Sequence, residues 1–473
     1  MRTHFLSLAL LLLAACTEAN PRPPPSDRFV FPSGLVHRVS SGSTNGVLYV
    51  ASANFDRCYD QGTVMAVDLD QVRGSGGVSL PALGAPGAPV STPPLKLEQL
   101  NVSESSRLLI QSYAGEMALW DRPDGAPRLF VPARADGDFI HYIDVSEPTR
   151  LDCVGASEGS RNCIDGALSL TAVPWLGNGD TPDLPRAPAP FGVDVTADGQ
   201  VWVTHVDPAD SPARSQNGFL SYLVKLDGRT PTLSTESFLP LETSGQAVGG
   251  SHSVEATERY AVVSGRFSNR VLNNTGRRFL LRLLDTQNAN RIIDPGLDLA
   301  FAARDARGFA LTPASPTRPR RLYLAVRSPD SLVVVDAQGL ETDSPSLRLV
   351  DSVPMPDGPT QVTLVSRGPT RSELVVVSCS AAGVVAIYDP DVGQVVSQVA
   401  VSEVPREQVA QPFGIAVQQQ GNAARLFVSN FGDGRVAVID LPDLASPQFA
   451  RLVAHLGTRQ DAQGSSSCQE VQQ

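Results

Sequence analysis

Short apolar runs separated by polar turns recur along most of this chain. The clearest group lies near the C-terminus, where residues 412–417, 425–430 and 435–440 are three runs in which apolar residues alternate or cluster. A Gly-Asp-Gly sequence at 432–434 separates the second run from the third and is typical of a hairpin turn. This pattern predicts three consecutive antiparallel strands.

An aspartate that closes an apolar run marks seven copies of this unit. The seven residues are Asp68, Asp144, Asp227, Asp285, Asp336, Asp389 and Asp440. A partner run precedes each of them, and three copies begin with a Pro-x-Gly sequence, at 32–34, 190–192 and 412–414. We interpret the glycine as the residue that turns the chain from a loop into a strand. We interpret the aspartates as caps of the turns that follow rather than as metal ligands.

The repeats have about four short strands each and almost no helical periodicity. They predict an all-β protein, a seven-bladed β-propeller with four antiparallel strands per blade, over residues 29–457. The physical reason is that one four-stranded sheet cannot bury both of its faces, whereas a ring of sheets can. Insertions at 74–94 and 146–190 lengthen the early copies. An eighth, degenerate blade around 151–173 is an alternative.

The ends of the chain must close this ring. Residues 448–455 are expected to form the outer strand of the last blade, with residues 29–31 as an extra strand beside it. A polar tail, 458–473, follows. We hypothesise that a disulfide between Cys58 and Cys468 staples the first blade to the last.

The repeated motif resembles that of a known family. It reads Gly-Ile-Ala-Val at 414–417, Leu-Phe-Val-Ser-Asn at 426–430 and Val-Ala-Val-Ile-Asp at 436–440. It resembles the YVTN-type repeat of bacterial surface-layer and YncE-like propellers and, more loosely, the lactonase-type seven-bladed propellers. The resemblance covers roughly residues 30–457 and implies the fold more than the activity, because propellers host binding, scaffolding, hydrolase and redox functions.

The N-terminus carries a targeting signal. The apolar run 5–15 is too short to span a bilayer and fits the core of a secretory signal. The sequence Leu-Ala-Ala-Cys at 13–16 resembles the lipobox of bacterial lipoproteins, which implies a signal peptide at 1–15 and lipidation of Cys16. Thr17 in place of aspartate implies sorting to the outer membrane. Residues 16–28, rich in proline, would then be an extended tether. The expected location is the cell envelope, anchored by lipid to the outer membrane and either periplasmic or surface-exposed; an ordinary signal peptide with a chance cysteine is the alternative.

Charge and cysteine content exclude some classes of function. The formal net charge is −11, and a surface without a basic stripe argues against a nucleic-acid partner. An exported compartment favours disulfides, and Cys153 and Cys163, which flank a polar loop, are the predicted pair. No C-x-x-C or C-x-x-C-H sequence occurs, and no cofactor is expected.

Five residues are candidates for a binding site at the mouth of the channel. Arg134, Arg266 and Arg327 lie at equivalent places beyond the second strands and could attract a carboxylate or sulfate of a polysaccharide or peptide. The alternative is that each pairs with a nearby aspartate and fixes its hairpin. His205 and His252 fall on the same face of neighbouring blades. Two imidazoles there could bind a divalent metal, although no H-x-H or H-E-x-x-H spacing supports a metal site.

The sequence favours a binding or scaffolding module for a protein or polysaccharide, anchored to the membrane through its lipid. No catalytic residue is assigned, because neither a G-x-S-x-G nucleophile motif nor a phosphate-binding loop occurs. The alternative function is a metal-dependent hydrolase, similar to the lactonase propellers, with its site at the channel mouth.

Overall fold

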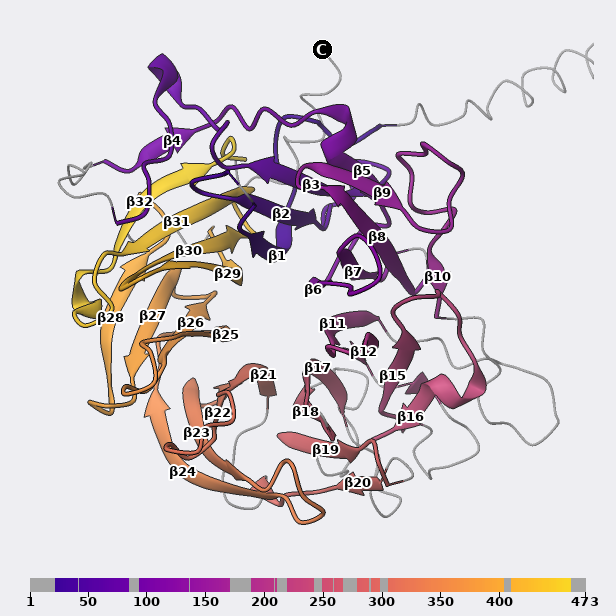
Figure 1. The fold of residues 1–473 in the computed structure, drawn as a ribbon, viewed down its shortest axis with the longest axis vertical. Helices are drawn as coiled ribbons and strands as arrows, with labels where there is room; N and C mark the ends of the chain where they lie inside the picture. Colours follow the sequence, from indigo (N-terminus) through magenta and orange to yellow (C-terminus); the bar gives the residue numbers. More distant parts are fainter. Residues whose placement is uncertain are drawn as a thin grey trace, which may run out of the picture.

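The computed structural model places seven antiparallel sheets, or blades, in a ring around a central channel (Figure 1). It describes residues 22–40, 42–84, 93–135, 137–170, 189–207, 209–210, 219–241, 249–257, 259–266, 279–288, 291–297, 305–403 and 410–460. The predicted seven-bladed β-propeller is therefore confirmed. Within these residues, no helix has the length and apolar character needed to cross a membrane.

The first four blades contain the irregular segments of the ring. Blade 1 consists of β1 (Pro32–Arg38), β2 (Val47–Ser52), β3 (Gly62–Asp68) and β5 (Arg107–Ile110). Blade 2 consists of β6 (Ala118–Trp120), β7 (Arg128–Ala133), β8 (Phe139–Glu147), β9 (Arg150–Cys153) and β10 (Leu168–Ser169). Blade 3 consists of β11 (Pro190–Val195), β12 (Gln200–His205), β15 (Tyr222–Asp227) and β16 (Phe238–Pro240), beside a small ribbon of β13 (Ala209–Asp210) and β14 (Phe219–Leu220). Blade 4 consists of β17 (Gly250–Ala256), β18 (Tyr260–Arg266), β19 (Leu281–Asp285) and β20 (Arg291–Ile293).

The last three blades are more regular. Blade 5 consists of β21 (Asp305–Leu311), β22 (Arg321–Arg327), β23 (Ser331–Gln338) and β24 (Ser346–Pro354). Blade 6 consists of β25 (Pro359–Val365), β26 (Leu374–Cys379), β27 (Val384–Asp389) and β28 (Gln394–Ala400). Blade 7 consists of β29 (Pro412–Gln420), β30 (Ala423–Asn430), β31 (Arg435–Leu441) and β32 (Arg451–Leu456), with β4 (Leu95–Leu97) added at its edge. Single 3-10 turns occur at Ser75–Gly77, Glu104–Ser106, Thr235–Ser237 and Pro447–Phe449.

The hydrophobic core is divided among the spaces between blades. Seven clusters of buried apolar side chains are present, and each contains residues of two neighbouring sheets. The cluster between blades 7 and 1, for example, packs Phe427 and Val438 against Leu48 and Met65, all of which are fully buried. Alternating side chains of one strand thus enter different clusters, because successive residues of a strand point to opposite faces. Each sheet buries both faces only because it has a neighbour on each side.

The segment in which an eighth blade was the alternative belongs to blade 2. Both β9 and β10 pair with β8, so they extend an existing sheet. Cys153 and Cys163 form the predicted disulfide across this loop, with their Cα atoms 5.1 Å apart. Cys58 is also disulfide-bonded, and Cys468, its predicted partner, lies outside the described residues.

Ring closure differs from the prediction. The outer strand of blade 7 is β32, as expected, but the extra strand beside it is β4, which runs parallel to β32 and comes from the proline-rich insertion of blade 1. Residues 29–31 do not form a strand. Phe31 has a positive φ of 53°, which breaks the extended conformation, and Phe29 is fully buried between blades 7 and 1. The insertion is therefore a clasp that holds the first blade to the last.

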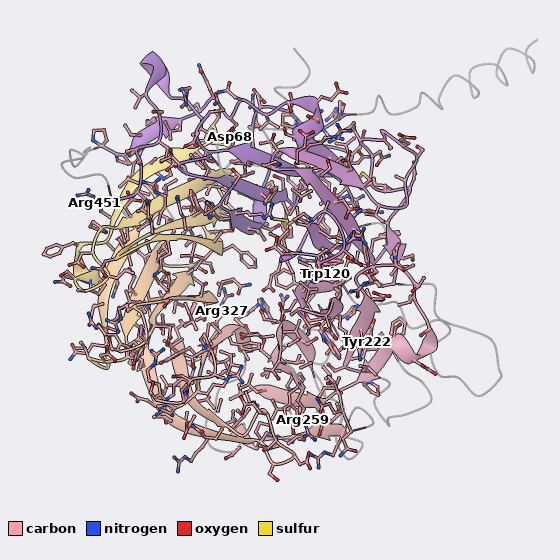
Figure 2. The ribbon with its side chains drawn as sticks, viewed as in Figure 1. Asp68, Trp120, Tyr222, Arg259, Arg327 and Arg451 are labelled. Carbon is pink, nitrogen blue, oxygen red and sulfur yellow. A yellow bond between two sulfur atoms is a disulfide. The ribbon has the colours of Figure 1, made fainter. Side chains whose placement is uncertain are left out.

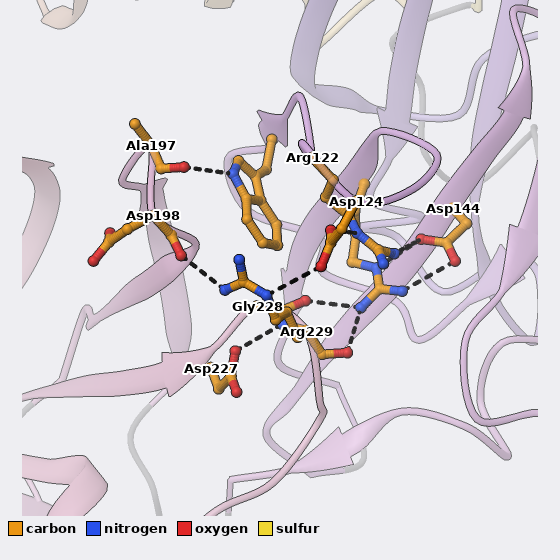
Figure 3. A network of polar contacts seen from close by, with 10 residues as sticks. Arg122, Asp124, Asp144, Ala197, Asp198, Asp227, Gly228 and Arg229 are labelled. Carbon is orange, nitrogen blue, oxygen red and sulfur yellow. Dashed lines mark hydrogen bonds and ion pairs between the residues drawn. The ribbon is translucent and has the colours of Figure 1, made fainter.

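Arginine–aspartate ion pairs lie at one end of five blades, within the described part of the chain. In four of them the arginine lies at the start of the second strand or directly before it, and in blade 6 it is Arg367, in the loop between β25 and β26. These pairs, called the Arg–Asp pairs below, are Arg128–Asp144, Arg259–Asp285, Arg321–Asp336, Arg367–Asp389 and Arg425–Asp440, with nitrogen–oxygen distances of 2.6 to 3.0 Å. In the first of them, Arg128 also donates to the carbonyl oxygens of Gly228 and Arg229 in the next blade (Figure 3).

The predicted turn caps are confirmed for four of the seven strand-closing aspartates. Asp68, Asp227, Asp285 and Asp389 each accept a hydrogen bond from the backbone N–H two residues further on. The arginine partners were not predicted. Two of the seven aspartates, Asp285 and Asp389, therefore cap a turn and also pair with an arginine.

Candidate binding site at the channel mouth

A β-bulge in the first strand of six blades places one side chain of each at the centre of the ring. The side chains within or beside these bulges that line the central cavity are Ser33, Phe191, His252, Arg307, Thr360 and Phe413. Ala114 lines the cavity from blade 2. The cavity has a volume of about 610 Å³. A bulge changes the direction of one side chain and leaves the rest of the strand in place. Each of these blades can therefore direct its own side chain into the central cavity from an equivalent position.

The residue after the bulged side chain is a glycine in four of these blades, namely Gly34, Gly192, Gly308 and Gly414. A methyl group on Gly414 would lie 2.2 Å from the carbonyl oxygen of Ser33 in the neighbouring blade, and one on Gly192 would lie 2.3 Å from that of His252. The sequence pattern suggested a turn-forming role for this glycine. The structure gives another reason, which is the close approach of neighbouring first strands.

A second set of side chains lines the cavity from the ends of the second strands. It consists of Ala53, Arg134, Arg266, Arg327, Ser380 and Phe431, one from each of six blades. Figure 2 shows Arg327 near the centre of the ring, whereas Arg259, at the other end of a second strand, lies near its edge. The three arginines predicted to share the mouth therefore do so, and Arg307, which was not predicted, joins them.

The four arginines of the mouth differ in their partners. Arg327 donates to the hydroxyl groups of Thr360 and Ser380 and to two backbone carbonyl oxygens, and Arg307 pairs with Asp305. Arg134 rests over the ring of Phe191, 5.2 Å from its centroid, and its buried Nη1 has no hydrogen-bond partner.

Arg266 likewise has no ion pair or hydrogen bond with any residue in the described segments. The aspartate pairing that was the alternative for these arginines thus holds for none of the three predicted ones within the described residues; Asp136, which follows Arg134, lies outside them.

Burial and mutual repulsion shift the pKa values of these arginines downward. Burial lowers the pKa of Arg266 to about 9, with further lowering by Arg307 and Arg134. Burial, followed by the charge of Arg307, lowers the pKa of Arg327 to about 10. The pKa of Arg134 is also lowered by burial, and the charges of Asp207 and Asp138 offset this only in part. All of these side chains remain cationic at neutral pH, so the cavity carries positive charge, which nearby aspartates such as Asp305 and Asp207 offset in part.

A chain of aromatic rings also lines the mouth. Phe31, Phe55 and Phe431 lie within 6.2 Å of one another, measured between ring centroids. Phe413 extends this group at 6.5 Å from Phe431, and Phe191 continues it at 5.7 Å from Phe413. Phe55 is 48% exposed, which is high for such a large apolar side chain. The group, called the aromatic wall below, comes from blades 7, 1 and 3.

The two predicted histidines do not share an environment. His252 lines the mouth, with its ring centroid 4.7 Å from that of Phe191 and its Nδ1 3.1 Å from the hydroxyl of Ser253. His205 is 1% exposed, its ring packs on Tyr222, and burial lowers its pKa to about 3. Among the residues that the structure describes, no group of three His, Cys, Asp or Glu side chains could hold a metal ion.

A smaller cavity of about 190 Å³ lies next to the mouth and shares Ser33 and Phe413 with it. Glu116 of blade 2 lines this chamber and accepts hydrogen bonds from Ser253, at 2.9 Å, and from Gln361. Burial raises the pKa of Glu116 to about 7. Among the described residues, the channel thus contains an acid without a cationic partner and three arginines, Arg134, Arg266 and Arg327, without an ion pair.

Glu116 and Arg307 were missed, although the sequence contains a signal for both. The first strands read Gly34-Leu35, Gly192-Val193 and Gly414-Ile415 in blades 1, 3 and 7, but Gly115-Glu116 in blade 2. Similarly, Arg307 precedes Gly308 at the place where blades 3 and 7 have phenylalanine. A polar residue in an apolar column of the repeat alignment marks each position.

The fold and the cavity together define a seven-bladed β-propeller with a cationic and aromatic channel mouth. No family model and no curated protein matches the chain. Among solved structures, the periplasmic gluconolactonase PpgL from Pseudomonas aeruginosa is similar with a TM-score of 0.46 and 14% identity, over 91% of this chain and 98% of PpgL. The dihydro-heme d1 dehydrogenase NirN has a TM-score of 0.43 and 14% identity, over 94% and 73% of the two chains. Apo AztD from Citrobacter koseri has a TM-score of 0.40 and 12% identity, over 90% and 86%. Similarity at this level carries no argument about the site.

Proposed function

We propose that this chain is a binding module of the cell envelope, held at the outer membrane by a lipid on Cys16, and that its channel mouth binds an anionic group of a protein or polysaccharide. The observation that carries the proposal is Arg134, a half-buried side chain whose Nη1 is buried and has no hydrogen-bond partner. A charged group taken out of water without a partner is costly, and an anionic ligand would supply the missing acceptor.

The surroundings of Arg134 support an anion rather than a neutral ligand. Arg266 and Arg307 line the same cavity, and the charges of all four mouth arginines lower the pKa of His252, after burial as the main cause. Carboxylate and sulfate groups accept the parallel N–H donors of arginine, and such charge-assisted hydrogen bonds are about twice as strong as neutral ones. A bound anion would relieve the repulsion among the arginines at the same time.

Anion binding can be tested by thermal melting with propionate or sulfate replacing chloride at constant ionic strength. A ligand that binds only the folded state raises its melting temperature. We expect a rise for the wild type and for the control Arg348→Met, which removes a side chain that is 78% exposed on β24. We expect no rise for Arg134→Met. Equal responses of all three proteins, or no response of the wild type, would contradict the anion site.

The lipid anchor needs a separate test, because residues 1–21 lie outside the described residues. The proposal rests on the lipobox-like sequence at 13–16 and on the proline-rich segment that follows it. Mass spectrometry of the N-terminal peptide from membrane fractions should find Cys16 as the first residue with a diacylglyceryl group. A Cys16→Ser variant should move from the membrane to the soluble fraction. An unmodified Cys16 in the membrane-bound protein would refute the anchor.

A further inference from the structure

Arginines and aromatic rings line the channel mouth from different blades, and the two groups meet where Phe191 of blade 3 lies against Arg134 of blade 2. The arginines that line the cavity come from blades 2, 4 and 5, namely Arg134, Arg266, Arg307 and Arg327. The aromatic residues that line it come from blades 1, 3 and 7, namely Phe55, Phe191, Phe413 and Phe431. The arginines alone would be enough to bind an anion. The aromatic residues therefore indicate that the ligand also has an apolar part.

The aromatic wall is not simply part of the core. Phe55 and Phe431 face each other at 5.4 Å, Phe55 is also 5.1 Å from Tyr113, and both phenylalanines line the cavity. Phe55 is exposed and Phe431 is half-buried, and aromatic side chains that gather at the opening of a cavity are typical of ligand or partner sites. The rings meet at tilted or edge-on angles, which leaves their faces available for another ring.

The lining also restricts what kind of ligand can fill the cavity. No aspartate or glutamate is among the residues that line it, within the described part of the chain. A ligand rich in hydroxyl groups needs acceptors as well as donors, because each buried hydroxyl without a partner costs free energy. The main donors here are guanidinium groups, and the neutral acceptors are few, namely the side chains of Ser33, His252, Thr360, Ser380 and Gln411. This composition fits an anion joined to an apolar ring better than it fits a sugar acid.

We infer that the group bound at the mouth is a carboxylate attached to an aromatic body, with the carboxylate on Arg134 and Arg266 and the ring against Phe55 and Phe431. The inference rests on the proposed function and names the chemistry of its ligand. Two sources could present this chemistry, a free arylalkanoic acid or the C-terminal residue of a polypeptide when that residue is aromatic. A cavity of about 610 Å³ is within the range of sites for small organic ligands.

The position of Phe191 strengthens the carboxylate contact. The guanidinium of Arg134 lies over the Phe191 ring, 5.2 Å from its centroid, and the imidazole ring of His252 packs beside it. The charged end of the ligand would therefore meet Arg134 over an apolar floor, where a charge-assisted hydrogen bond is stronger than in water. Once the aromatic body covers the mouth, water is excluded from the same contact.

Isothermal titration of the full mature chain with four probes tests the ligand chemistry. The probes are 3-phenylpropionate, its neutral analogue 3-phenylpropanamide, propionate and glucuronate. We expect 3-phenylpropionate to bind at least about tenfold more tightly than the other three, because burying a phenyl ring contributes about 1.5–3 kcal/mol. The amide lacks the charge, and propionate and glucuronate lack the ring.

Variants then assign the two ends of the ligand to the two walls. Arg134→Met should abolish the preference for 3-phenylpropionate over its amide. Phe431→Ala should abolish the preference for 3-phenylpropionate over propionate, while propionate binding stays. Arg348→Met is the matched control and should leave both preferences unchanged. If Phe431→Ala fails to fold, as a melting curve would show, Phe55→Ala provides the same test from an exposed position.

The source of the ligand is distinguished by a further pair of probes, the tripeptide Gly-Gly-Phe and its C-terminal amide. Binding of the peptide acid more tightly than 3-phenylpropionate identifies a polypeptide C-terminus, and weaker binding identifies a free acid. If propionate and glucuronate bind as tightly as 3-phenylpropionate, the aromatic inference is wrong although the anion site stands. If no carboxylate binds, both the inference and the proposed function fail.

Discussion

Strand β7 has an arginine at each end, and the two side chains differ in their hydrogen-bond and ion-pair partners. Arg128, at its start, is buried and makes two hydrogen bonds to Asp144 and two to carbonyl oxygens of blade 3 (Figure 3). Arg134, just after its end, is half-buried, and its guanidinium has an aromatic ring beneath it and a buried Nη1 without a hydrogen-bond partner. About 20 Å of one strand separates a completed ionic contact from an incomplete one.

The same contrast recurs in blades 4 and 5. Arg259 begins the hairpin of β18 and pairs with Asp285, which raises its pKa, whereas Arg266 ends the same strand and has its pKa lowered to about 9 by burial. Arg321 and Arg327 bound β22 in the same way, one paired with Asp336 and the other in the channel. The ring therefore pairs its arginines with aspartates at one face, whereas Arg134, Arg266 and Arg327 at the other face have no such pair among the described residues, and there we propose that a ligand binds.

The largest effect is expected from breaking one of the Arg–Asp pairs. Arg425 is fully buried and pairs with Asp440 at 2.6 Å. Arg425→Met leaves a carboxylate in a poorly solvated place, and removal of one partner of a buried pair costs about 3–5 kcal/mol. Urea unfolding should show this loss in the free energy of unfolding. The double variant Arg425→Met with Asp440→Leu should recover most of it, and if it does not, the pair is not the cause.

A smaller effect, dependent on pH, is expected at Glu116. Its pKa in the folded chain is about 7 against an ordinary value of 4.5, so the folded state holds a proton that the unfolded state has lost between these two values. A raised carboxyl pKa means that stability falls as pH rises through this window and stays low above it. Glu116→Gln removes the penalty, and the variant should exceed the wild type by about 3 kcal/mol at pH 8 and by about half of that near pH 5.5.

The measurement is urea unfolding of both proteins at each pH. The comparison between the two proteins matters, because buried histidines such as His141 and His205, with pKa values lowered to about 3 by burial, destabilise both proteins in acid to the same extent. A stability difference that does not change with pH would show that Glu116 is ionised in the folded chain and would remove the contrast between channel and Arg–Asp pairs.

Sequence periodicity predicted the blades because it is a local property of each strand. Alternating apolar residues and strand-closing aspartates were enough to count seven copies, and the equivalence of the copies placed Arg134, Arg266 and Arg327 at one mouth. The clasp could not be predicted in this way, since β4 is three residues long and its partner β32 lies more than 350 positions away along the chain. The pairing of β4 with β32 depends on closure of the ring, and a local sequence pattern contains no information about that closure.

The mouth was predicted only in part, for a related reason. The repeat shows which position faces the channel, but which side chains meet there depends on the β-bulges, which the pattern does not reveal. His205 was placed beside His252 from strand position alone, whereas the structure packs it on Tyr222. The aromatic wall, drawn from three blades, was missed because each phenylalanine alone looks like an ordinary core residue.

The smallest change in the free energy of unfolding is expected for substitution of Arg134. The sign of that change shows whether Arg134 differs from the paired arginine Arg128. Arg134→Met removes a half-buried cation that has no ion pair in the described segments, and the thioether can pack on Phe191 in its place. Without carboxylates in the buffer, we expect the variant to be as stable as the wild type or more stable by about 1 kcal/mol, because deletion of a charge without an ion pair relieves a desolvation cost. Urea unfolding in chloride and again in propionate measures this, and propionate should reverse the order by stabilising only the wild type. A loss of several kcal/mol in the free energy of unfolding in chloride, similar to that of Arg425→Met, would mean that Arg134 is a structural residue. Arg128 and Arg134, at the two ends of β7, would then both stabilise the fold.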